Sequence, residues 1–533
     1  MTLKETLAER IIILDGAMGT MIQGFNLTEK DFRGERFAHS AVDLRGNNDL
    51  LNITRPDCIR QIHQAYIDAG ADIITANTFS SNRISQKEYF CEEVAAEMAR
   101  EGARIAREVA DHSDRQVWVC GTMGPTSKTL SLSPDMNRPD YRAVTFDEMA
   151  DAYEEQARSL IEGGVDVLML ETCFDALNAK AALYAIQKIN DERGEVFPVM
   201  ISATINDRSG RTLTGQTLEA FYTSVSHYPM LSFGLNCSFG VKDLGEFIRQ
   251  LASELPVRIS IHPNAGLPNE MGEYEEQADF TAFYLKAMAK EGLLNIAGGC
   301  CGTTPDHIRA IAEAMKGQTP HAIPQLDDHL VVSGLEPVVV DRKVSNFVNV
   351  GERTNVAGSR KFARLISEKK YDEALSVAAK QIEDGATIID ISMDDAMLDS
   401  QVEMGTYLRH VANDPAVAKA AIMVDSSEWT SLIEGLKNAQ GKCIVNSISL
   451  KNGEEEFIAH AKELRRFGAA VVVMAFDEKG QAGTYERKIE VCQRAYDILV
   501  GKLNFPPHDI IFDVNVLSIG TGIAQHIDIK DNV

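Results

Sequence analysis

Residues 65–74 read Ala-Tyr-Ile-Asp-Ala-Gly-Ala-Asp-Ile-Ile, and residues 160–169 read Leu-Ile-Glu-Gly-Gly-Val-Asp-Val-Leu-Met. In both stretches an amphipathic helix ends at glycine and a β-branched apolar run follows. The glycine is typical of a left-handed helix cap, and the unbroken apolar run is typical of a strand buried on both faces. Helices and strands that alternate at this spacing predict βα units and a parallel sheet.

The same pattern predicts eight strands in the first part of the chain, at residues 11–14, 72–76, 117–120, 167–170, 198–203, 231–235, 258–261 and 295–297. Eight βα units over about 300 residues have the number and size of a (β/α)8 barrel, whose chemistry lies at the C-terminal ends of its strands. We therefore predict a first barrel domain over residues 1–316. The segments after its strands are polar and rich in glycine, as expected of a substrate site.

The pattern stops at residues 317–345, where prolines stand among polar and isolated apolar residues. We interpret this segment as a linker that runs extended along the first barrel. The pattern then resumes with six predicted strands, at residues 347–350, 388–391, 422–424, 444–445, 471–475 and 510–512. The predicted fold class is α/β, with two consecutive (β/α)8-type TIM barrels, the second (346–533) incomplete after about six strands. A complete open sheet of six strands is the alternative, although an open parallel edge favours aggregation.

Three cysteines stand at predicted strand ends of the first barrel. Cys237 follows the sixth strand, and Cys300 and Cys301 follow the eighth within the glycine-framed stretch 298–305, Gly-Gly-Cys-Cys-Gly-Thr-Thr-Pro. Three thiolates on zinc leave a fourth position for an exchangeable ligand, as a catalytic zinc needs. Because zinc deprotonates a bound thiol, the pattern points to alkyl transfer onto a substrate sulfur. The alternatives are a pair of small buried residues or a vicinal disulfide.

Four other polar residues belong to the same predicted barrel mouth. Asp15 and Glu171 are carboxylates suited to a substrate ammonium group, or else caps of the segments that follow them. Asn236 either donates to a substrate carboxylate or ties its own loop. His262 is interpreted as a packed or second-shell histidine, since three sulfurs already suffice for the metal. We expect no catalytic residue beyond the zinc ligands, because zinc performs the deprotonation.

The predicted strands of the second barrel end in acids and amides with little basic charge. These ends include Glu352, Asn355, Asp390, Asp425, Asn446, Asp477 and Asp513. Carboxylate and amide oxygens pair with the N–H groups of an amino-pyrimidinone edge, so this lining suits a neutral heterocycle with several N–H donors. For each single Asp, ordinary solvation at a strand end is the alternative.

Composition limits the partners and the compartment. The formal net charge of −25 argues against nucleic acid and against an anionic membrane surface as partners. The sequence shows no signal peptide and no apolar run of transmembrane length. Nine cysteines, an odd number, in a large chain without such a signal indicate reduced thiols. We expect a cytoplasmic protein.

Five motifs together resemble the cobalamin-dependent methionine synthase family. They are residues 14–20 (Leu-Asp-Gly-Ala-Met-Gly-Thr), 32–37 (Phe-Arg-Gly-Glu-Arg-Phe), 46–51 (Gly-Asn-Asn-Asp-Leu-Leu), 298–305 and 351–355 (Gly-Glu-Arg-Thr-Asn). The resemblance runs over the whole chain and corresponds to the N-terminal half of those enzymes, where a homocysteine barrel precedes a methyltetrahydrofolate barrel. One departure is residues 75–76, Thr-Ala, where the family usually reads Glu-Thr.

The resemblance implies a role for each candidate residue. Zinc and the homocysteine thiolate would be held by Cys237, Cys300 and Cys301, with Asp15 and Glu171 near the amino-acid end of homocysteine. The implied pterin contacts are Glu352, Asn355, Asp425, Asn446 and Asp513.

The resemblance also implies a methyl shuttle with a further partner. In that family 5-methyltetrahydrofolate methylates cob(I)alamin, and methylcobalamin donates to the zinc-bound thiolate. The Asp-x-His-x-x-Gly segment that binds cobalamin in the family does not occur in this sequence, so we expect a separate cobalamin-binding domain or protein as partner. Two alternatives remain: a cobalamin-independent zinc homocysteine S-methyltransferase with a sulfonium or betaine donor, and a substrate-binding fragment that needs a cobalamin-carrying chain.

Overall fold

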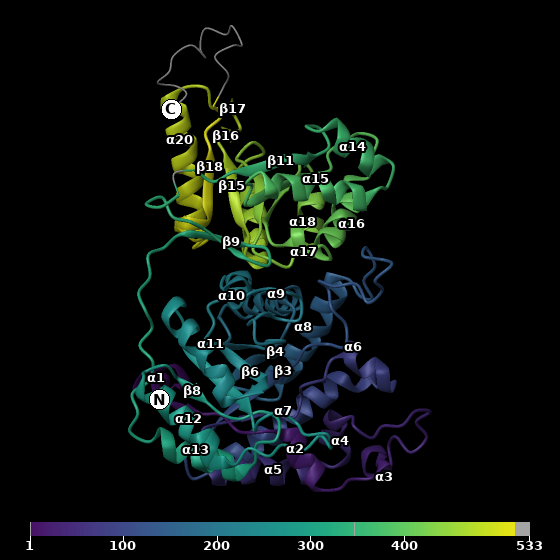
Figure 1. Ribbon diagram of the computed structural model, residues 1–533, viewed down its shortest axis with the longest axis vertical. Helices are drawn as coiled ribbons and strands as arrows, with labels where there is room; N and C mark the ends of the chain where they lie inside the picture. Colours follow the sequence, from purple (N-terminus) through teal and green to yellow (C-terminus); the bar gives the residue numbers. More distant parts are fainter. Residues whose placement is uncertain (1, 346, 517–533) are drawn as a thin grey trace. The chain divides into compact units, whose positions relative to one another are not determined.

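The computed structural model describes residues 2–345 and 347–516, which form two compact units (Figure 1). Unit 1 consists of Met1–Leu130, Ala143–Thr214 and Pro229–Leu326, and unit 2 of Ser131–Arg142, Gly215–Tyr228 and Asp327–Val533. The predicted second domain includes residues 346 and 517–533, which lie outside the described residues.

Unit 1 contains an eight-stranded parallel barrel in which each strand pairs with its neighbour in sequence. A single bridge between Leu14 and Ile73 joins the first strand to the second and closes the ring. The strands are β1 (Ile12–Ile13), β2 (Ile73–Thr75), β3 (Trp118–Met123), β4 (Val167–Cys173), β5 (Val199–Ala203), β6 (Ser232–Gly240), β7 (Ile259–Asn264) and β8 (Ile296–Ala297). Each overlaps a predicted strand, and the predicted barrel is confirmed.

Helices follow the strands of the barrel, as the βα pattern predicts (Figure 1). The helix α5 begins with Pro56 and ends at Gly70, whose φ of +106° is a backbone conformation that favours glycine. The helices along this half of the chain are α1 (Leu3–Glu9), α2 (Met18–Gly24), α3 (Glu29–Arg33), α4 (Leu51–Thr54), α5 (Pro56–Ala69), α6 (Arg83–Gln86), α7 (Ala95–Asp111), α8 (Phe146–Glu162), α9 (Ala176–Arg193), α10 (Leu218–Val225), α11 (Val241–Glu254), α12 (Ala278–Lys290) and α13 (Pro305–Met315).

The barrel interior is filled by side chains from the strands and from α1. Leu3 and Leu7 of this first helix join one buried apolar cluster with strand residues such as Ile12, Met169 and Met200. Burial of apolar surface is the main favourable term in folding. The interior is therefore a packed core, and in barrels of this kind the functional site lies at the C-terminal ends of the strands.

Unit 2 contains a six-stranded parallel sheet in the order β11-β12-β13-β14-β15-β18. The strands are β11 (Val350–Asn355), β12 (Ile388–Ser392), β13 (Ala421–Asp425), β14 (Ile444–Ile448), β15 (Ala470–Met474) and β18 (Ile510–Asp513). The helices are α14 (Arg360–Ser367), α15 (Tyr371–Glu383), α16 (Ser400–Ala412), α17 (Pro415–Ala418), α18 (Trp429–Asn438), α19 (Glu454–Phe467) and α20 (Tyr485–Tyr496). All six predicted strands are present, and the α/β fold class is confirmed.

The expectation of an extended linker is wrong over residues 330–340. There β9 (Leu330–Ser333) and β10 (Pro337–Val340) form an antiparallel hairpin, with Val332 paired to Val338. Val332 is buried in the same apolar cluster as Ile388 and Ile444 of the six-stranded sheet. The two four-residue apolar runs were interpreted as isolated, but tertiary burial against unit 2 stabilises them as strands. A second short hairpin, β16 (Phe476–Asp477) with β17 (Gly480–Gln481), was also not predicted.

A buried ion pair supports unit 2. Lys442 Nζ lies 2.7 Å from Asp509 Oδ1, and the two side chains are 8% and 6% exposed. Removing one partner leaves the other charge buried without compensation, which costs about 3–5 kcal/mol.

We expect Lys442→Ala to lower the stability of unit 2 by about that amount. The chain has two tryptophans, Trp118 in unit 1 and Trp429 in unit 2. Urea unfolding in a Trp118→Phe background therefore reports on unit 2 through Trp429 fluorescence. Lys380→Ala, which removes an exposed lysine paired with Asp384, is the control and should leave the midpoint unchanged. Equal midpoints for Lys442→Ala and Lys380→Ala would contradict this account.

Candidate functional site

Three cysteine sulfurs converge at the C-terminal end of the unit 1 barrel. Cys237 lies in the second half of β6, and Cys300 and Cys301 lie in the turn after β8. The Sγ of Cys301 lies 4.0 Å from that of Cys237 and 4.0 Å from that of Cys300. All three sulfurs lie within 4.8 Å of one another, and among residues 2–345 and 347–516 they form the one His, Cys, Asp or Glu group with this geometry.

The spacing of the sulfurs fits one tetrahedral zinc ion. Zinc–sulfur bonds of about 2.3 Å place two tetrahedral ligands about 3.8 Å apart, close to the separations of 4.0 Å. A disulfide needs sulfurs about 2.05 Å apart, so the alternative of a vicinal disulfide does not hold for this structure. The described cysteines are all free thiols. The three sulfurs therefore form a donor set that could hold zinc and leave a fourth position for another ligand.

The three thiols share hydrogen bonds that favour one anion among them. The neighbouring thiols of Cys300 and Cys301 lower the pKa of Cys237 to about 3. Contact with Cys237 raises the pKa of the Cys300 thiol and that of the Cys301 thiol. Ionisation of all three at neutral pH needs a cation among them, because like charges at this distance repel.

The turn after β8 holds the cysteine pair close to the barrel wall. A Cβ on Gly299 would lie 2.4 Å from the hydroxyl oxygen of Thr303, so no larger residue fits there. That hydroxyl donates to the Cys300 carbonyl at 2.6 Å and accepts from the Ala17 N–H at 3.2 Å. The Cys300 N–H donates to the Pro263 carbonyl at 2.8 Å. The glycine frame noted in the sequence is thus a steric requirement of this turn.

A cavity of about 360 Å³ opens onto the three sulfurs. Asp15, Asp49 and Glu171 belong to its lining, which contains no Lys, Arg or His. Other lining residues are Leu14, Gly16, Ala17, Met18, Gly19, Thr20, Gly46, Asn47, Asn48, Thr75, Ala76, Asn77, Thr78, Phe79, Ser80, Tyr89, Thr122, Thr172, Gly299 and the three cysteines. A wall with three carboxyl groups favours a positively charged group such as an ammonium.

Asp15 is held in place by Thr75. Its carboxylate accepts from the Thr75 N–H at 2.8 Å and from the Thr75 hydroxyl at 3.0 Å. Burial raises the pKa of Asp15 well above its ordinary value. Thr75 is one of the positions at which the sequence departs from the resembled motif, so its hydroxyl supplies a contact that the sequence comparison did not predict.

The other two carboxyl groups of the cavity are also perturbed. Burial, with a smaller contribution from Cys237, raises the pKa of Glu171 to about 7. Burial raises the pKa of Asp49 to about 7 as well, although it accepts hydrogen bonds from the Ser80 N–H and the Ser81 hydroxyl. Asp49 was not among the predicted site residues. It lies in the motif of residues 46–51, and this motif is the sequence feature from which Asp49 could have been identified.

Asn236 and His262 lie on adjacent strands and differ in their contacts. Asn236 is fully buried, with hydrogen bonds to Thr172, Ser202 and Cys300. His262 is 1% exposed, and neither ring nitrogen has a hydrogen-bond partner among the described residues. Burial lowers the pKa of His262 to about 3, so it is a neutral, packed histidine.

In unit 2, four of the five predicted pterin contacts come together at the strand ends. The Asn355 side-chain N–H donates to Asp425 at 3.3 Å. The side chains of Asn355 and Asn446 also lie close enough to Asp390, which is 3% exposed, to oppose the rise of its pKa. The fourth, Glu352, lies close enough for its negative charge to affect both aspartates.

The pKa values of Asp390 and Asp425 are both raised toward neutral pH. The pKa of Asp390 is raised to about 7 by burial and by the charges of Asp425 and Glu352. The pKa of Asp425 is raised to about 6 by burial and by Asp394 and Glu352. Asp390 was counted among the polar strand ends but not among the pterin contacts. One of its carboxylate oxygens is buried without a hydrogen-bond partner among the described residues, so it is ready to accept a ligand N–H.

The fifth predicted pterin contact is placed differently. Asp513 is exposed at the end of β18 and accepts from the Asn515 N–H at 2.9 Å. Within residues 347–516 it has no hydrogen bond to the other four predicted contacts. The structure thus brings four of them together and leaves Asp513 at the edge.

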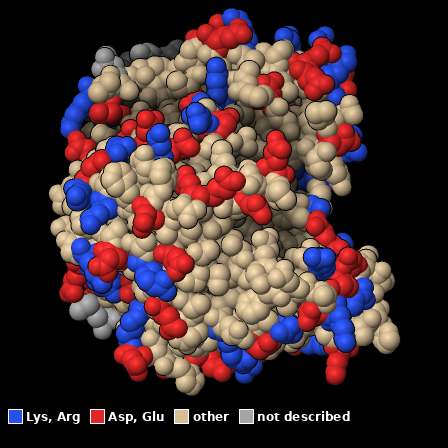
Figure 2. Space-filling model, turned by 60° about the horizontal axis from the view of Figure 1, so that its bottom comes forward, with Lys and Arg blue, Asp and Glu red and all other residues tan. Residues whose placement is uncertain are grey.

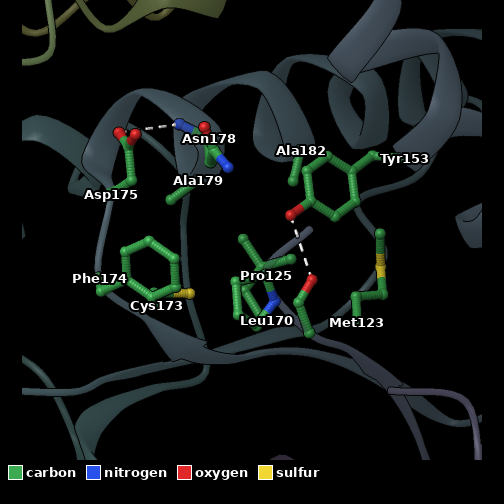
Figure 3. A pocket seen from close by; sticks show the side chains of 11 residues that line it. Met123, Pro125, Tyr153, Leu170, Cys173, Phe174, Asp175, Asn178, Ala179 and Ala182 are labelled. Atoms are coloured by element: carbon green, nitrogen blue, oxygen red, sulfur yellow. Dashed lines mark hydrogen bonds between the residues drawn. The ribbon is translucent and has the colours of Figure 1, made fainter. Parts of the chain in front are cut away.

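A second cavity in unit 1 is too small for a substrate (Figure 3). Its volume is about 10 Å³, room for about one water molecule. Tyr153 points across it and donates to the Gly124 carbonyl at 3.1 Å, while Asp175 caps α9 beside Asn178. This cavity belongs to the packing of the strand ends.

The charge distribution on the surface and the hydropathy of the helices concern two partners that the net charge argues against, nucleic acid and a membrane. On the face drawn in Figure 2, Lys and Arg are interspersed with Asp and Glu. A nucleic-acid-binding face instead carries clustered basic side chains. None of the helices formed by the described residues is both long and apolar enough to cross a bilayer.

Comparisons with known proteins match both halves of the chain. Residues 12–315 match the family described as homocysteine S-methyltransferase, and residues 351–532 match the family described as pterin binding enzyme. The last residues of the second match lie outside the described part of the structure.

Similar solved structures include two forms of the homocysteine methyltransferase MmuM from Escherichia coli. The oxidized form is 19% identical, with a TM-score of 0.45 over 57% of this chain and 95% of that chain. The metallated form is 19% identical, with a TM-score of 0.42 over 57% of this chain and 96% of that chain.

Proposed function

The chain belongs to the homocysteine S-methyltransferase family, and we propose that it forms methionine from homocysteine with zinc and a folate methyl donor. In full, the proposed activity is that of a 5-methyltetrahydrofolate–homocysteine methyltransferase, with cobalamin carrying the methyl group between the two substrates. The observation that carries the proposal is the convergence of Cys237, Cys300 and Cys301 beside a cavity with an acidic wall.

The three cysteines would hold zinc and leave its fourth position directed at the substrate thiol. Zinc supplies Lewis acidity that lowers the pKa of a thiol bound to it. The short turn after β8 fixes two of the sulfurs, and β6 supplies the third. Their role is to position the thiol and to keep its sulfur free of the proton, so no separate general base is needed.

The carboxylates of the cavity would hold the other end of homocysteine. Asp15 and Glu171 are retained as contacts of the substrate ammonium group, and Asp49 joins them on the same wall. An ammonium ion beside a carboxylate favours the ionised form of the acid, which opposes the effect of burial. Binding would thus be coupled to loss of protons from this wall.

Unit 2 would supply the methyl donor. The match of residues 351–532 to pterin-binding enzymes supports a folate over the sulfonium or betaine donor of the alternative hypothesis. We assign the pterin edge to Glu352, Asn355, Asp425 and Asn446, with Asp390 added, and keep Asp513 as an outer contact. No described residue of this chain is assigned to cobalamin, which in this proposal belongs to another domain or protein.

Two measurements test the proposal directly. X-ray absorption at the zinc edge should count three sulfur neighbours in the free protein and four with homocysteine. Methyl transfer to homocysteine should be seen with added methylcobalamin and not with S-methylmethionine. A sulfur count unchanged by homocysteine, or transfer from S-methylmethionine alone, would refute it.

We also expect homocysteine binding to release about one proton per site more than homoserine binding does at neutral pH. A thiol with an ordinary pKa of about 8.5 is mostly protonated at pH 7, and the bound form is the thiolate. Calorimetry in two buffers of different ionisation enthalpy measures this number. Homoserine, which has a hydroxyl in place of the thiol, is the control ligand and should release only the protons that the carboxyl wall loses to the ammonium group. Equal proton release by the two ligands would contradict thiolate binding.

A further inference from the structure

We propose that Asn236 is a positioning residue for the cysteine site, holding Cys300 and two strained strand ends, and that it does not contact homocysteine. The proposal rests on the proposed function in one respect: the three sulfurs hold a metal ion. It replaces the expectation that this side chain binds the substrate carboxylate.

The first observation is strain at the two strand ends that Asn236 joins. Thr172, Cys237 and Ser238 have φ values of +58°, +62° and +59°, which are uncommon for residues other than glycine. The pairing of β4 with β5 shifts register between Leu170 and Cys173, and that of β6 with β7 shifts between Asn236 and Gly240. Bulges of this kind redirect side chains, and strained backbone of this kind needs support from its surroundings.

The second observation is that the orientation of the Asn236 amide is fixed by its partners. Its oxygen accepts from the Thr172 N–H at 3.0 Å, and a backbone N–H can only donate. The same oxygen accepts from the Ser202 hydroxyl at 2.6 Å. The nitrogen must therefore face the other way, where it donates to the Thr172 hydroxyl at 2.8 Å and to the Cys300 sulfur at 3.7 Å.

These contacts use the full capacity of the amide. An Asn side chain has two N–H donors and an oxygen with two lone pairs, and each has a partner within the protein. The side chain is 0% exposed. A substrate carboxylate could bind it only by displacing one of these partners, so a role in holding the site is favoured over a role in binding homocysteine.

The physical consequence concerns the sulfur and its position. An N–H donor directed at Cys300 stabilises negative charge on that sulfur. The two bonds to Thr172 hold the end of β4 against the end of β6, and the Ser238 hydroxyl lies 2.6 Å from that of Thr204 on the other side of Cys237. Groups that orient metal ligands in this way typically contribute 10- to 100-fold to metal affinity.

The test compares Asn236→Asp with Ser202→Ala in the full chain. Asn236→Asp retains the oxygen that faces the Thr172 N–H but replaces both N–H donors by an acceptor that repels the sulfur. We expect its zinc affinity to fall about 10- to 100-fold in competition with a chelator. Cobalt-loaded protein should also show a shifted sulfur-to-cobalt charge-transfer band. Ser202→Ala removes one bond to the oxygen only, and its zinc affinity should stay within about threefold of wild type.

Each outcome decides the question. Asn236→Ala, which removes all four bonds, provides a second variant and should lose at least as much zinc affinity as Asn236→Asp. If Asn236→Asp and Asn236→Ala bind zinc like wild type but raise the KM for homocysteine, Asn236 contacts the substrate and the inference is wrong. If wild type binds no zinc with three sulfurs, the proposed function fails first, and the inference falls with it.

Discussion

Replacing Cys300 with alanine should lower zinc affinity by roughly 100- to 1,000-fold and abolish methylation of homocysteine. Zinc sites with four protein ligands bind with about 10–16 kcal/mol, or roughly 2.5–4 kcal/mol per ligand. Chelator competition measures the affinity, and methionine formation from added methylcobalamin measures the activity. The same losses are expected for Cys237→Ala and Cys301→Ala, since each of the three sulfurs would be one ligand of the proposed metal site.

Cys91→Ala is the matched control for these variants. Cys91 is a buried free cysteine of unit 1 that lies outside the group of three sulfurs. Its replacement should leave zinc content and activity at the wild-type level. Full zinc retention and activity in any one of the three ligand variants would exclude the proposed site.

Replacing Asp425 with asparagine should weaken binding of 5-methyltetrahydrofolate about 10- to 100-fold. A hydrogen bond to a charged group contributes about 1.5–3 kcal/mol, and the new amide would also place N–H groups against the donor on Asn355. Zinc affinity and the affinity for homocysteine should be unchanged, because they belong to unit 1. Fluorescence titration of the full chain with the folate gives the Kd.

Asp384→Asn removes the same charge from unit 2 at an exposed position paired with Lys380. Its Kd for the folate should match that of wild type. If Asp425→Asn and Asp384→Asn bind the folate equally well, the strand ends of unit 2 are not the pterin site.

The sequence predicted most strands well because they are continuous apolar runs between a helix and a polar turn; β11 is the exception, since it spans Val350–Asn355 and shares only its first residue with the predicted strand at 347–350. This signal is local, so it survives without knowledge of tertiary contacts. The hairpin at residues 330–340 was missed because its two runs are short and become buried only against Ile388 and Ile444. These two strands depend on tertiary contacts, which a local sequence pattern does not reveal.

For the candidate site, too, some features could be predicted from the sequence and others could not. The strand-end positions of Cys237, Cys300 and Cys301 follow from the count of βα units, so their convergence could be predicted. The contacts of Asn236 could not, because they depend on the backbone turning back at Thr172. Asp390 lacked a distinguishing feature in the sequence until its burial beside Asp425 was known.

The closure of the unit 1 ring has a consequence for how the acidic wall of the cavity responds to motion. Between β1 and β2 the ladder is a single bridge at Leu14 and Ile73, so this seam has less backbone pairing than the joints that carry full ladders. Asp15 follows on one side of the seam and Thr75 on the other, and two hydrogen bonds join them. Local fluctuations concentrate where pairing is sparse. Widening of this seam would therefore stretch the two hydrogen bonds between Thr75 and Asp15 and move this carboxyl group away from its support on β2.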